Sequence, residues 1–232
     1  MTATGTRHVV VVMAKEPVPG QVKTRLEEVM PAEDCAELAE AMLRDTLVNL
    51  EGHDWEKVLA VWPRGCIRRM REFCPTKSWK VIAQKGPNLF ERMSGIVESL
   101  FADGANAVVL RGSDAPDMKA SRVMNMFAQI EEEGVDGAIV PDRGGGYSGL
   151  ALSSFVPVVL QAPEDIHAGA TVAVLECASK AELLVKALEP HPDVDTPADL
   201  EDLAARLDRD PESAPDTTLW MFKTGRLPLE PR

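Results

Sequence analysis

The chain has 232 residues, of which 45% are hydrophobic and 27% charged, a balance typical of a globular protein with a sizeable core. Its 25 Lys and Arg against 37 Asp and Glu give a net charge of −12, which disfavours binding to nucleic acids or anionic membranes. The cysteines show neither CxxC nor zinc-like spacing, and the sequence contains no signal-peptide pattern and no apolar run of the roughly 20 residues that span a membrane. We therefore expect a reduced cytoplasmic protein without nucleic-acid or membrane partners.

Short apolar runs alternate with segments of helical periodicity. The first run, Val9–Ala14, is β-branched and unalternating, which is typical of a strand buried on both faces of a parallel sheet. Further extended segments are predicted at 58–62, 80–83, 107–110, 137–140, 150–152 and 183–188. Helices are predicted at 31–50, 66–73, from 88 onward, at 120–132, 171–181 and 197–207. This alternation indicates an α/β protein with a parallel sheet and helices on both faces.

The domain organisation follows from the absence of internal repeats and long linkers. We expect a single domain over residues 1–207. The remaining residues, 208–232, begin as a polar tail and then carry the apolar run Leu219–Phe222. This tail is expected to pack either on its own domain or on the partner subunit of a homodimer.

The loop after the first strand gathers positive charge in an acidic protein. It carries Lys15, Lys23 and Arg25, while Gly20 lets backbone amides approach a ligand closely. Arg can bind phosphate oxygens at two points, whereas Lys acts as a point charge. Ligands of such sheets bind beyond the carboxyl ends of the strands, so this loop is a candidate phosphate site. It is no P-loop, because GxxxxGK[ST] is absent, and a solvated turn with scattered surface cations is the alternative.

Carboxylates follow the fourth main strand and precede the last helix. Asp114 and Asp117 stand on either side of a proline, and Asp195 comes directly before a capping threonine. Magnesium is a hard ion that is typically held by one or two carboxylates together with substrate phosphates. Asp114 and Asp195 are therefore candidate metal ligands. The alternatives are local: Asp117 would cap the helix that begins near residue 120, and Asp195 would compensate a helix dipole.

A glycine-rich segment, Gly144–Gly146, precedes Tyr147, the single tyrosine of the chain. Glycines allow a tight backbone path beside a substrate, although a plain turn explains them equally well. Gly145, Gly146 and Tyr147 are therefore candidate substrate-binding residues.

Four segments in order along the chain resemble motifs of a bacterial family of GT-A-like nucleotide-diphospho-sugar transferases. Residues 15–26 resemble its K-x-P-x-x-G-x-x-K-T-R-L opening, and residues 193–200 resemble its D-x-D-T-P-x-D-L. Residues 84–93 and 110–118 resemble its Q-x-G-x-L-x-x-R and G-[ST]-D-x-P stretches. The phospholactate guanylyltransferases, a neighbouring family, are similar in the opening and in the late D-T-P-x-D-L.

The resemblance implies a three-layer α/β/α fold with a mostly parallel mixed sheet of the nucleotide-diphospho-sugar transferase (GT-A) type. It implies that Asp114 and Asp195 hold Mg²⁺ or Mn²⁺, and that Lys23 and Asp114 are catalytic. The residues expected to bind substrate are Lys15, Gly20, Lys23, Thr24, Arg25, Asp117, Gly145, Gly146 and Tyr147.

The activity expected from this resemblance is metal-dependent transfer from a nucleotide sugar or nucleotide to an acceptor that the sequence does not identify. A nucleotidyltransferase of the guanylyltransferase type, which releases pyrophosphate, is one alternative. The other is a non-catalytic nucleotide-binding protein on the same fold. It is motivated by Gly144, which stands where the family usually has an acidic residue before Gly-Gly-Tyr.

Overall fold

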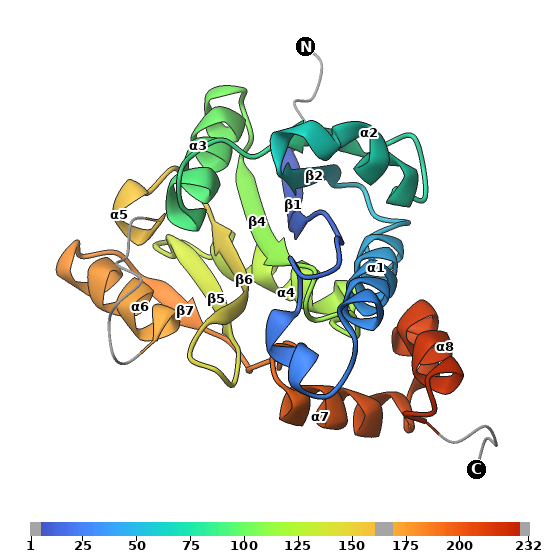
Figure 1. Cartoon of the computed structure of the whole chain (residues 1–232). Helices are drawn as coiled ribbons and strands as arrows, with labels where there is room; N and C mark the ends of the chain where they lie inside the picture. The colour runs from blue at the N-terminus through green and yellow to red at the C-terminus, as the bar shows by residue number, and fades with distance from the viewer. Residues whose placement is uncertain (1–5, 161–168, 228–232) are drawn as a thin grey trace.

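A seven-stranded sheet forms the middle layer of the computed structural model, which describes residues 6–160 and 169–227 (Figure 1). The strands are β1 (His8–Lys15), β2 (Glu56–Trp62), β3 (Lys80–Ala83), β4 (Ala107–Gly112), β5 (Gly137–Pro141), β6 (Tyr147–Leu152) and β7 (Val185–Ala187). Their order across the sheet is β3-β2-β1-β4-β6-β5-β7. β6 runs antiparallel to both of its neighbours, and the other paired strands are parallel. The predicted three-layer fold with a mostly parallel mixed sheet is confirmed.

Helices cover both faces of this sheet. The α-helices are α1 (Ala32–Val48), α2 (Ile67–Met70), α3 (Leu89–Ala102), α4 (Ala120–Ile130), α5 (Pro157–Leu160), α6 (Ala170–Lys180), α7 (Pro197–Leu207) and α8 (Pro215–Lys223). Short 3₁₀ turns are η1 (Thr24–Glu28), η2 (Arg64–Cys66), η3 (Arg71–Phe73) and η4 (Pro211–Ser213). Apolar side chains of α1, α2 and α4 pack on one face of the sheet, and those of α3, α5 and α6 pack on the other. The alternating strands and helices of the sequence thus become the three layers.

Two predicted elements differ from the structure. The helix expected at 66–73 is one short α-helical segment, α2, between the 3₁₀ turns η2 and η3. Its continuation is limited by Pro75, because the residue before a proline disfavours helical backbone angles. The strand expected at 150–152 begins earlier, at Tyr147, because pairing with β5 on one side and β4 on the other extends it.

A third apolar cluster lies beside the sheet layers, where α8 packs against α1 and α7 packs against η1 and α8 (Figure 1). It includes Leu26 of η1 and Val194, both of which are fully buried. Asp45 of α1 binds the start of α8, because its carboxylate accepts hydrogen bonds from the backbone nitrogens of Asp216 and Thr217 at 2.9 and 2.7 Å. The C-terminal segment through residue 227 therefore packs on its own chain. Because Leu26 and Val194 share this cluster, it also holds the first loop close to the segment that precedes α7.

No helix within residues 6–160 and 169–227 combines the length and the apolar character needed to cross a membrane.

Candidate functional site

Lys15 and Asp114, two of the candidate residues from the sequence, lie at one edge of the sheet together with other strand-end residues. β1 ends at Lys15, β2 at Trp62, and Gln84 directly follows β3. β4 leads to Asp114, and β5 leads to Asp142. These five strands run in the same direction, so their carboxyl ends meet at the same edge. The connections diverge between β1 and β4, where such sheets typically bind ligands.

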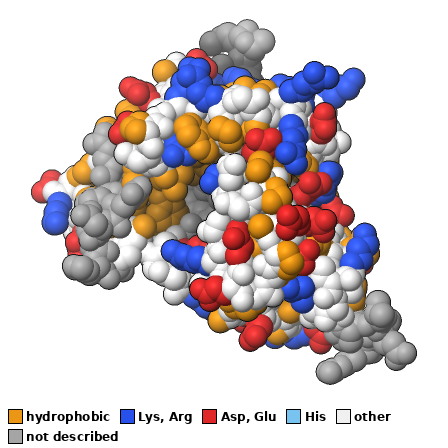
Figure 2. Space-filling model, in the orientation of Figure 1, with side chains coloured by type: hydrophobic (Ala, Val, Ile, Leu, Met, Phe, Trp, Pro, Cys, Tyr) orange, Lys and Arg blue, Asp and Glu red, His pale blue; other side chains and the backbone are white. Residues whose placement is uncertain are grey.

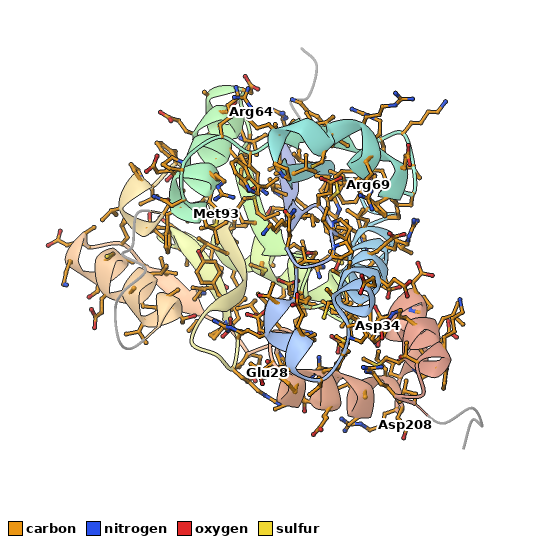
Figure 3. All side chains as sticks on the ribbon, viewed as in Figure 1. Glu28, Asp34, Arg64, Arg69, Met93 and Asp208 are labelled. Carbon is orange, nitrogen blue, oxygen red and sulfur yellow. The ribbon has the colours of Figure 1, made fainter. Side chains whose placement is uncertain are left out.

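A pocket of about 470 Å³ opens at this edge. One wall is largely apolar, and Figure 2 shows a hollow lined mostly by hydrophobic side chains on the face seen there. Met93 extends from α3 into it (Figure 3). The apolar and aromatic lining residues include Met13, Trp62, Leu89, Phe90, Met93 and Tyr147, and the polar ones include Lys15, Gln84, Arg92, Arg111, Asp114 and Asp142. The pocket therefore has an apolar wall and a charged end.

Lys23 joins two acidic segments that lie far apart in the sequence. Its Nζ atom is 2.7 Å from Oδ1 of Asp114 and 3.2 Å from Oδ1 of Asp195, and it donates a hydrogen bond to the carbonyl of Val194 at 2.5 Å. The side chain of Lys23 is only 6% exposed, whereas those of Asp114 and Asp195 are 44% and 48% exposed. Burial lowers the pKa of Lys23, but the two carboxylates more than offset this, so its pKa lies above the ordinary value. Lys23 is therefore a fixed cation between two accessible carboxylates.

The third apolar cluster holds this ion-pair group in place. Leu26, three residues after Lys23, is buried in it, and so is Val194, next to Asp195. The backbone nitrogen of Val194 donates to the carbonyl of Asp114 at 2.9 Å, which ties the two acidic segments together. Behind Asp195, a capping box starts α7, as the sequence predicted. The geometry of the group thus depends on packing outside the sheet.

The remaining residues of the first loop lie around the same group. Arg25 is 72% exposed in its side chain, with Nη1 3.7 Å from Oδ2 of Asp195. The Nζ atom of Lys15 donates to the carbonyl of Gln21 at 2.6 Å, which closes the loop on itself. Gly20 lies at its exposed tip with φ +73°, a conformation that favours glycine. Thr24 begins η1. Lys15 is among the residues that line the pocket. Arg25 is exposed beside Asp195, so its guanidinium is accessible to a ligand that binds there.

Two further carboxylates near this group were missed in the sequence. Asp142 accepts a hydrogen bond from the backbone nitrogen of Gly146 at 2.7 Å, and burial is the main cause that raises its pKa. Burial, together with the charges of Asp142, Asp195 and Asp114, raises the pKa of Asp193 to about 7. Asp142 precedes the glycine run by two residues, so an acidic side chain lies beside Gly-Gly-Tyr despite Gly144. An Asp before glycines is a turn signal that could have identified it.

The glycine-rich segment also meets the pocket. Gly146 and Tyr147 line it, and the carbonyl of Gly145 accepts a hydrogen bond from the backbone nitrogen of Thr171 at 3.0 Å. The Tyr147 hydroxyl lies 3.8 Å from the sulfur of Met93, and burial raises the pKa of Tyr147 to about 12. Tyr147 is therefore a neutral group of the pocket wall at neutral pH.

Asp117 has a different environment. Oδ2 of Asp117 accepts a hydrogen bond from Nε of Arg206 at 2.7 Å, and Oδ1 lies 3.2 Å from Nε2 of His191. Burial raises the pKa of Asp117, but the bonds and charges of His191 and Arg206 more than offset this and hold it well below its usual range. The capping alternative is wrong, because Lys119 is the N-cap of α4 and no side chain caps it. Asp117 is not among the described residues that line the pocket.

The pocket wall formed by α3 and the end of β2 had not been assigned from the sequence. The Gln84 side-chain amide is buried and donates to the carbonyls of Ala14 and Ala60 at 3.2 and 2.8 Å. The guanidinium of Arg92 lies 4.1 Å from the ring centre of Trp62, within the range of a cation–π contact. The motif-like stretch 84–93, which contains both Gln84 and Arg92, was the available sequence signal. The Arg92–Trp62 contact joins residues 30 positions apart and had no local signal.

Comparison with known proteins places these features in a family context. Residues 50–164, just under half of the chain, match a family described as "Uncharacterized protein conserved in bacteria (DUF2064)". No curated protein matches the sequence. The crystal structure of a protein described as a "putative nucleotide-diphospho-sugar transferase" from Desulfovibrio desulfuricans G20 is similar with 27% identity and a TM-score of 0.86. The match covers 94% of this chain and 95% of that one.

More distant structures share the fold. A cytidylyltransferase from Leptospira borgpetersenii serovar Hardjo-bovis (strain JB197) has 12% identity and a TM-score of 0.56, covering 90% of this chain and 97% of that one. A CMP:2-keto-3-deoxy-manno-octonic acid synthetase in complex with CTP has 15% identity and a TM-score of 0.53, covering 88% and 99%. The resemblance predicted from the sequence is therefore confirmed: the chain is similar over nearly its whole length to a nucleotide-diphospho-sugar transferase-like protein and has the fold of the cytidylyltransferases.

Proposed function

We propose that the chain is a transferase that uses a nucleotide or nucleotide sugar and binds its phosphates between the first loop and the carboxylates Asp114 and Asp195. The observation that carries this proposal is the position of Lys23, which joins Asp114, a residue of the pocket lining, to Asp195. The similarity to a nucleotide-diphospho-sugar transferase-like protein over nearly the whole chain supports it.

The donor set is compatible with a divalent cation that binds together with substrate phosphates. Within residues 6–160 and 169–227, no group of three or more His, Cys, Asp or Glu side chains is arranged to hold a metal ion by itself. Asp114 and Asp195 nevertheless offer partly exposed carboxylate oxygens that meet at Lys23, and Asp142 and Asp193 lie close enough to interact with them electrostatically. Mg²⁺ commonly uses one or two carboxylates and completes its shell with phosphate and water. We propose Asp114 and Asp195 as the residues that hold Mg²⁺ or Mn²⁺, which would neutralise charge on the leaving phosphate.

The side chains of this chain would act by positioning and by electrostatics. Arg25 is exposed and has the planar guanidinium that binds phosphate oxygens at two points. Lys15 and Lys23 add point charges on either side of the loop, and Gly20 keeps its tip free of a side chain. Asp114 orients Lys23 and, in our proposal, the cation. Gly146 and Tyr147 form the wall against which the transferred group or acceptor would lie.

Two reactions are compatible with this arrangement. Glycosyl transfer would release a nucleoside diphosphate, and nucleotidyl transfer would release pyrophosphate. We favour glycosyl transfer, because the structure with the higher TM-score and identity is described as a nucleotide-diphospho-sugar transferase rather than as a cytidylyltransferase. The non-catalytic alternative was motivated by Gly144, and Asp142 weakens that argument because its carboxylate contacts the backbone nitrogen of Gly146.

A binding experiment tests the site before any acceptor is known. The intact chain is screened by thermal shift with nucleoside di- and triphosphates and nucleotide sugars, each with and without Mg²⁺, because ligands of the native state raise its melting temperature. The best ligand is then titrated by calorimetry against Asp114→Asn, Asp195→Asn and the matched control Asp208→Asn. Asp208 is an exposed carboxylate at the C-terminal end of α7 (Figure 3), the opposite end from Asp195.

We expect Mg²⁺-dependent affinity to fall about 100-fold in Asp114→Asn and Asp195→Asn, a loss of roughly 2.7 kcal/mol, and to stay within twofold in Asp208→Asn. Equal affinity in all four proteins would contradict the metal assignment. Analysis of products over an acceptor panel then separates the reactions: pyrophosphate indicates nucleotidyl transfer, and a nucleoside diphosphate indicates glycosyl transfer. Tight binding with neither product would favour the non-catalytic alternative.

A further inference from the structure

A second cavity lies on the sheet face covered by α3, between that helix and the edge strand β3. Its volume is about 420 Å³. The floor is apolar, with Val58 and Ile82 from the sheet and Ile96 and Leu100 from the helix. Gly95 of α3 faces the cavity, and a side chain built there would meet no atom within 4 Å. The cavity is therefore open space between a helix and a sheet edge, with room for an apolar body. We call it the β3–α3 groove.

The rim of the β3–α3 groove is basic in an acidic protein. Lys80, Lys85 and Arg92 line it, against the single carboxylate of Asp103. Neither Lys80 nor Lys85 forms an ion pair with any of the residues that the structure describes. The chain as a whole carries a net charge of −12. The groove is thus a local concentration of free cations around an apolar floor.

Arg92 lies between the β3–α3 groove and the pocket at the carboxyl edge, and it lines both. Its guanidinium stacks over Trp62 of the pocket, 4.1 Å from the ring centre. Among the described residues, the guanidinium forms one hydrogen bond, from Nη2 to the carbonyl of Pro87 at 3.4 Å. The Nε atom is buried and has no hydrogen-bond partner in the described part of the chain. A buried donor without a partner is costly, so an acceptor group in this position would be favourable.

We propose that the β3–α3 groove binds a small amphipathic anion, a molecule with an apolar body and a phosphate, sulfonate or carboxylate group. The apolar body lies on Ile82, Ile96 and Leu100, and the anionic group lies among Lys80, Lys85 and Arg92. An added peptide strand fits less well, because lysines along an edge strand such as β3 oppose strand pairing. The bound anion contacts the same arginine that stacks on Trp62, so this second site shares one residue with the proposed transferase site.

The probe for the test is 8-anilinonaphthalene-1-sulfonate, which combines an aromatic body with a sulfonate and fluoresces when it leaves water. The intact chain is titrated beside Gly95→Leu, which fills the groove, and Gly95→Ala, which raises helix propensity similarly without filling it. A second pair consists of two double variants. One carries Lys80→Gln and Lys85→Gln together, and its control carries Arg68→Gln and Arg71→Gln together, which removes two exposed charges outside the groove. Thermal melting of each variant shows that it is folded.

We expect saturable binding that weakens at least tenfold in Gly95→Leu and by less than twofold in Gly95→Ala. The double lysine variant should weaken binding about fivefold, and the arginine control should leave it unchanged. Absence of binding to the unaltered chain would overturn the proposal, and so would equal affinity in Gly95→Leu and Gly95→Ala, which would place the probe elsewhere. No nucleotide enters this experiment, so its outcome is independent of the proposed transferase activity.

Discussion

Asp114 and Asp117 lie three residues apart on the loop between β4 and α4, yet their environments are opposite. The side chain of Asp114 is 44% exposed and shares Lys23 with Asp195 at the pocket. The side chain of Asp117 is 7% exposed and is bound by Arg206 and His191 away from the pocket. A partly exposed carboxylate can exchange a protein partner for a ligand, whereas a buried carboxylate cannot do so without a large loss of folding stability. The comparison supports our proposal that Asp114 binds a ligand, whereas Asp117 stabilises the fold.

Arg111 explains how one short loop carries both carboxylates. Its buried guanidinium donates to the carbonyls of Ala115 at 2.8 Å and Met118 at 3.2 Å. Burial lowers the pKa of Arg111 to about 10, and the charge of Asp117 counteracts that shift. Arg111 thus fixes the path of the loop from beneath, and Asp117 supplies part of its counter-charge. This leaves Asp114 on the pocket side.

The largest expected effect is on stability, in Asp117→Asn. The substitution leaves Arg206 with only the partly exposed Asp202 as a partner among the described residues and removes the counter-charge of the buried Arg111, so we expect the unfolding free energy to fall by about 3 kcal/mol. Urea unfolding followed by circular dichroism measures it. Arg206→Gln alone and combined with Asp117→Asn complete a double-mutant cycle. Additive losses in the double variant would contradict a direct interaction between the two side chains.

The difference between wild type and Asp117→Asn should depend on pH. The folded-state pKa of Asp117 is lowered, so its contribution is fully present above its unfolded-state pKa of about 3.9 and is lost as pH falls through the folded-state value. We expect the stability gap to be full at pH 7 and at pH 5, and clearly smaller at pH 3. Urea titrations of both proteins at these three pH values measure it. A gap that is unchanged at pH 3 would show that packing, rather than charge, causes the loss.

Asp114→Asn should show the converse pattern. Asp114 is partly exposed and solvent screens its charge, and Lys23 keeps Asp195 as a partner, so the stability loss should be about 1 kcal/mol or less. The same variant is expected to lose Mg²⁺-dependent nucleotide affinity, whereas Asp117→Asn, measured below its melting temperature, should retain most of it. If Asp114→Asn were as unstable as Asp117→Asn, the assignment of separate roles would be wrong.

The smallest expected effect belongs to a third ion pair from the same loop. Lys119 Nζ lies 2.7 Å from Oδ2 of Asp210, and the two side chains are 62% and 48% exposed. Because exposed pairs contribute little, Lys119→Ala should change the unfolding free energy by about 0.5 kcal/mol or less and leave nucleotide binding unaltered. Urea unfolding at low and at high salt measures this. A loss comparable to that of Asp117→Asn would show that side-chain exposure does not determine how much each of these ion pairs contributes to stability.

Much of the fold was predictable because its signals are local. Strand β3 was predicted at the residues where it occurs, and so was α7 behind its capping threonine. The unalternating Val9–Ala14 run identified a strand that lies between two neighbours, with four of its residues fully buried. The helix expected at 66–73 was less regular than predicted, because periodicity does not distinguish an α-helix from a series of 3₁₀ turns.

The sequence by itself determined which residue types stand at strand ends and helix starts, namely the cations of the first loop, Asp114 after β4 and Asp195 before α7. The tertiary structure decided which of them meet and how exposed each one is. Asp117 is buried because Arg206, 89 positions away, reaches it from α7. Lys23 is buried because η1 packs against α1 and α7. Desolvation and ion pairing depend on such long-range contacts, so exposure of a carboxylate, and with it the assignment of binding or structural roles, is a property of the fold.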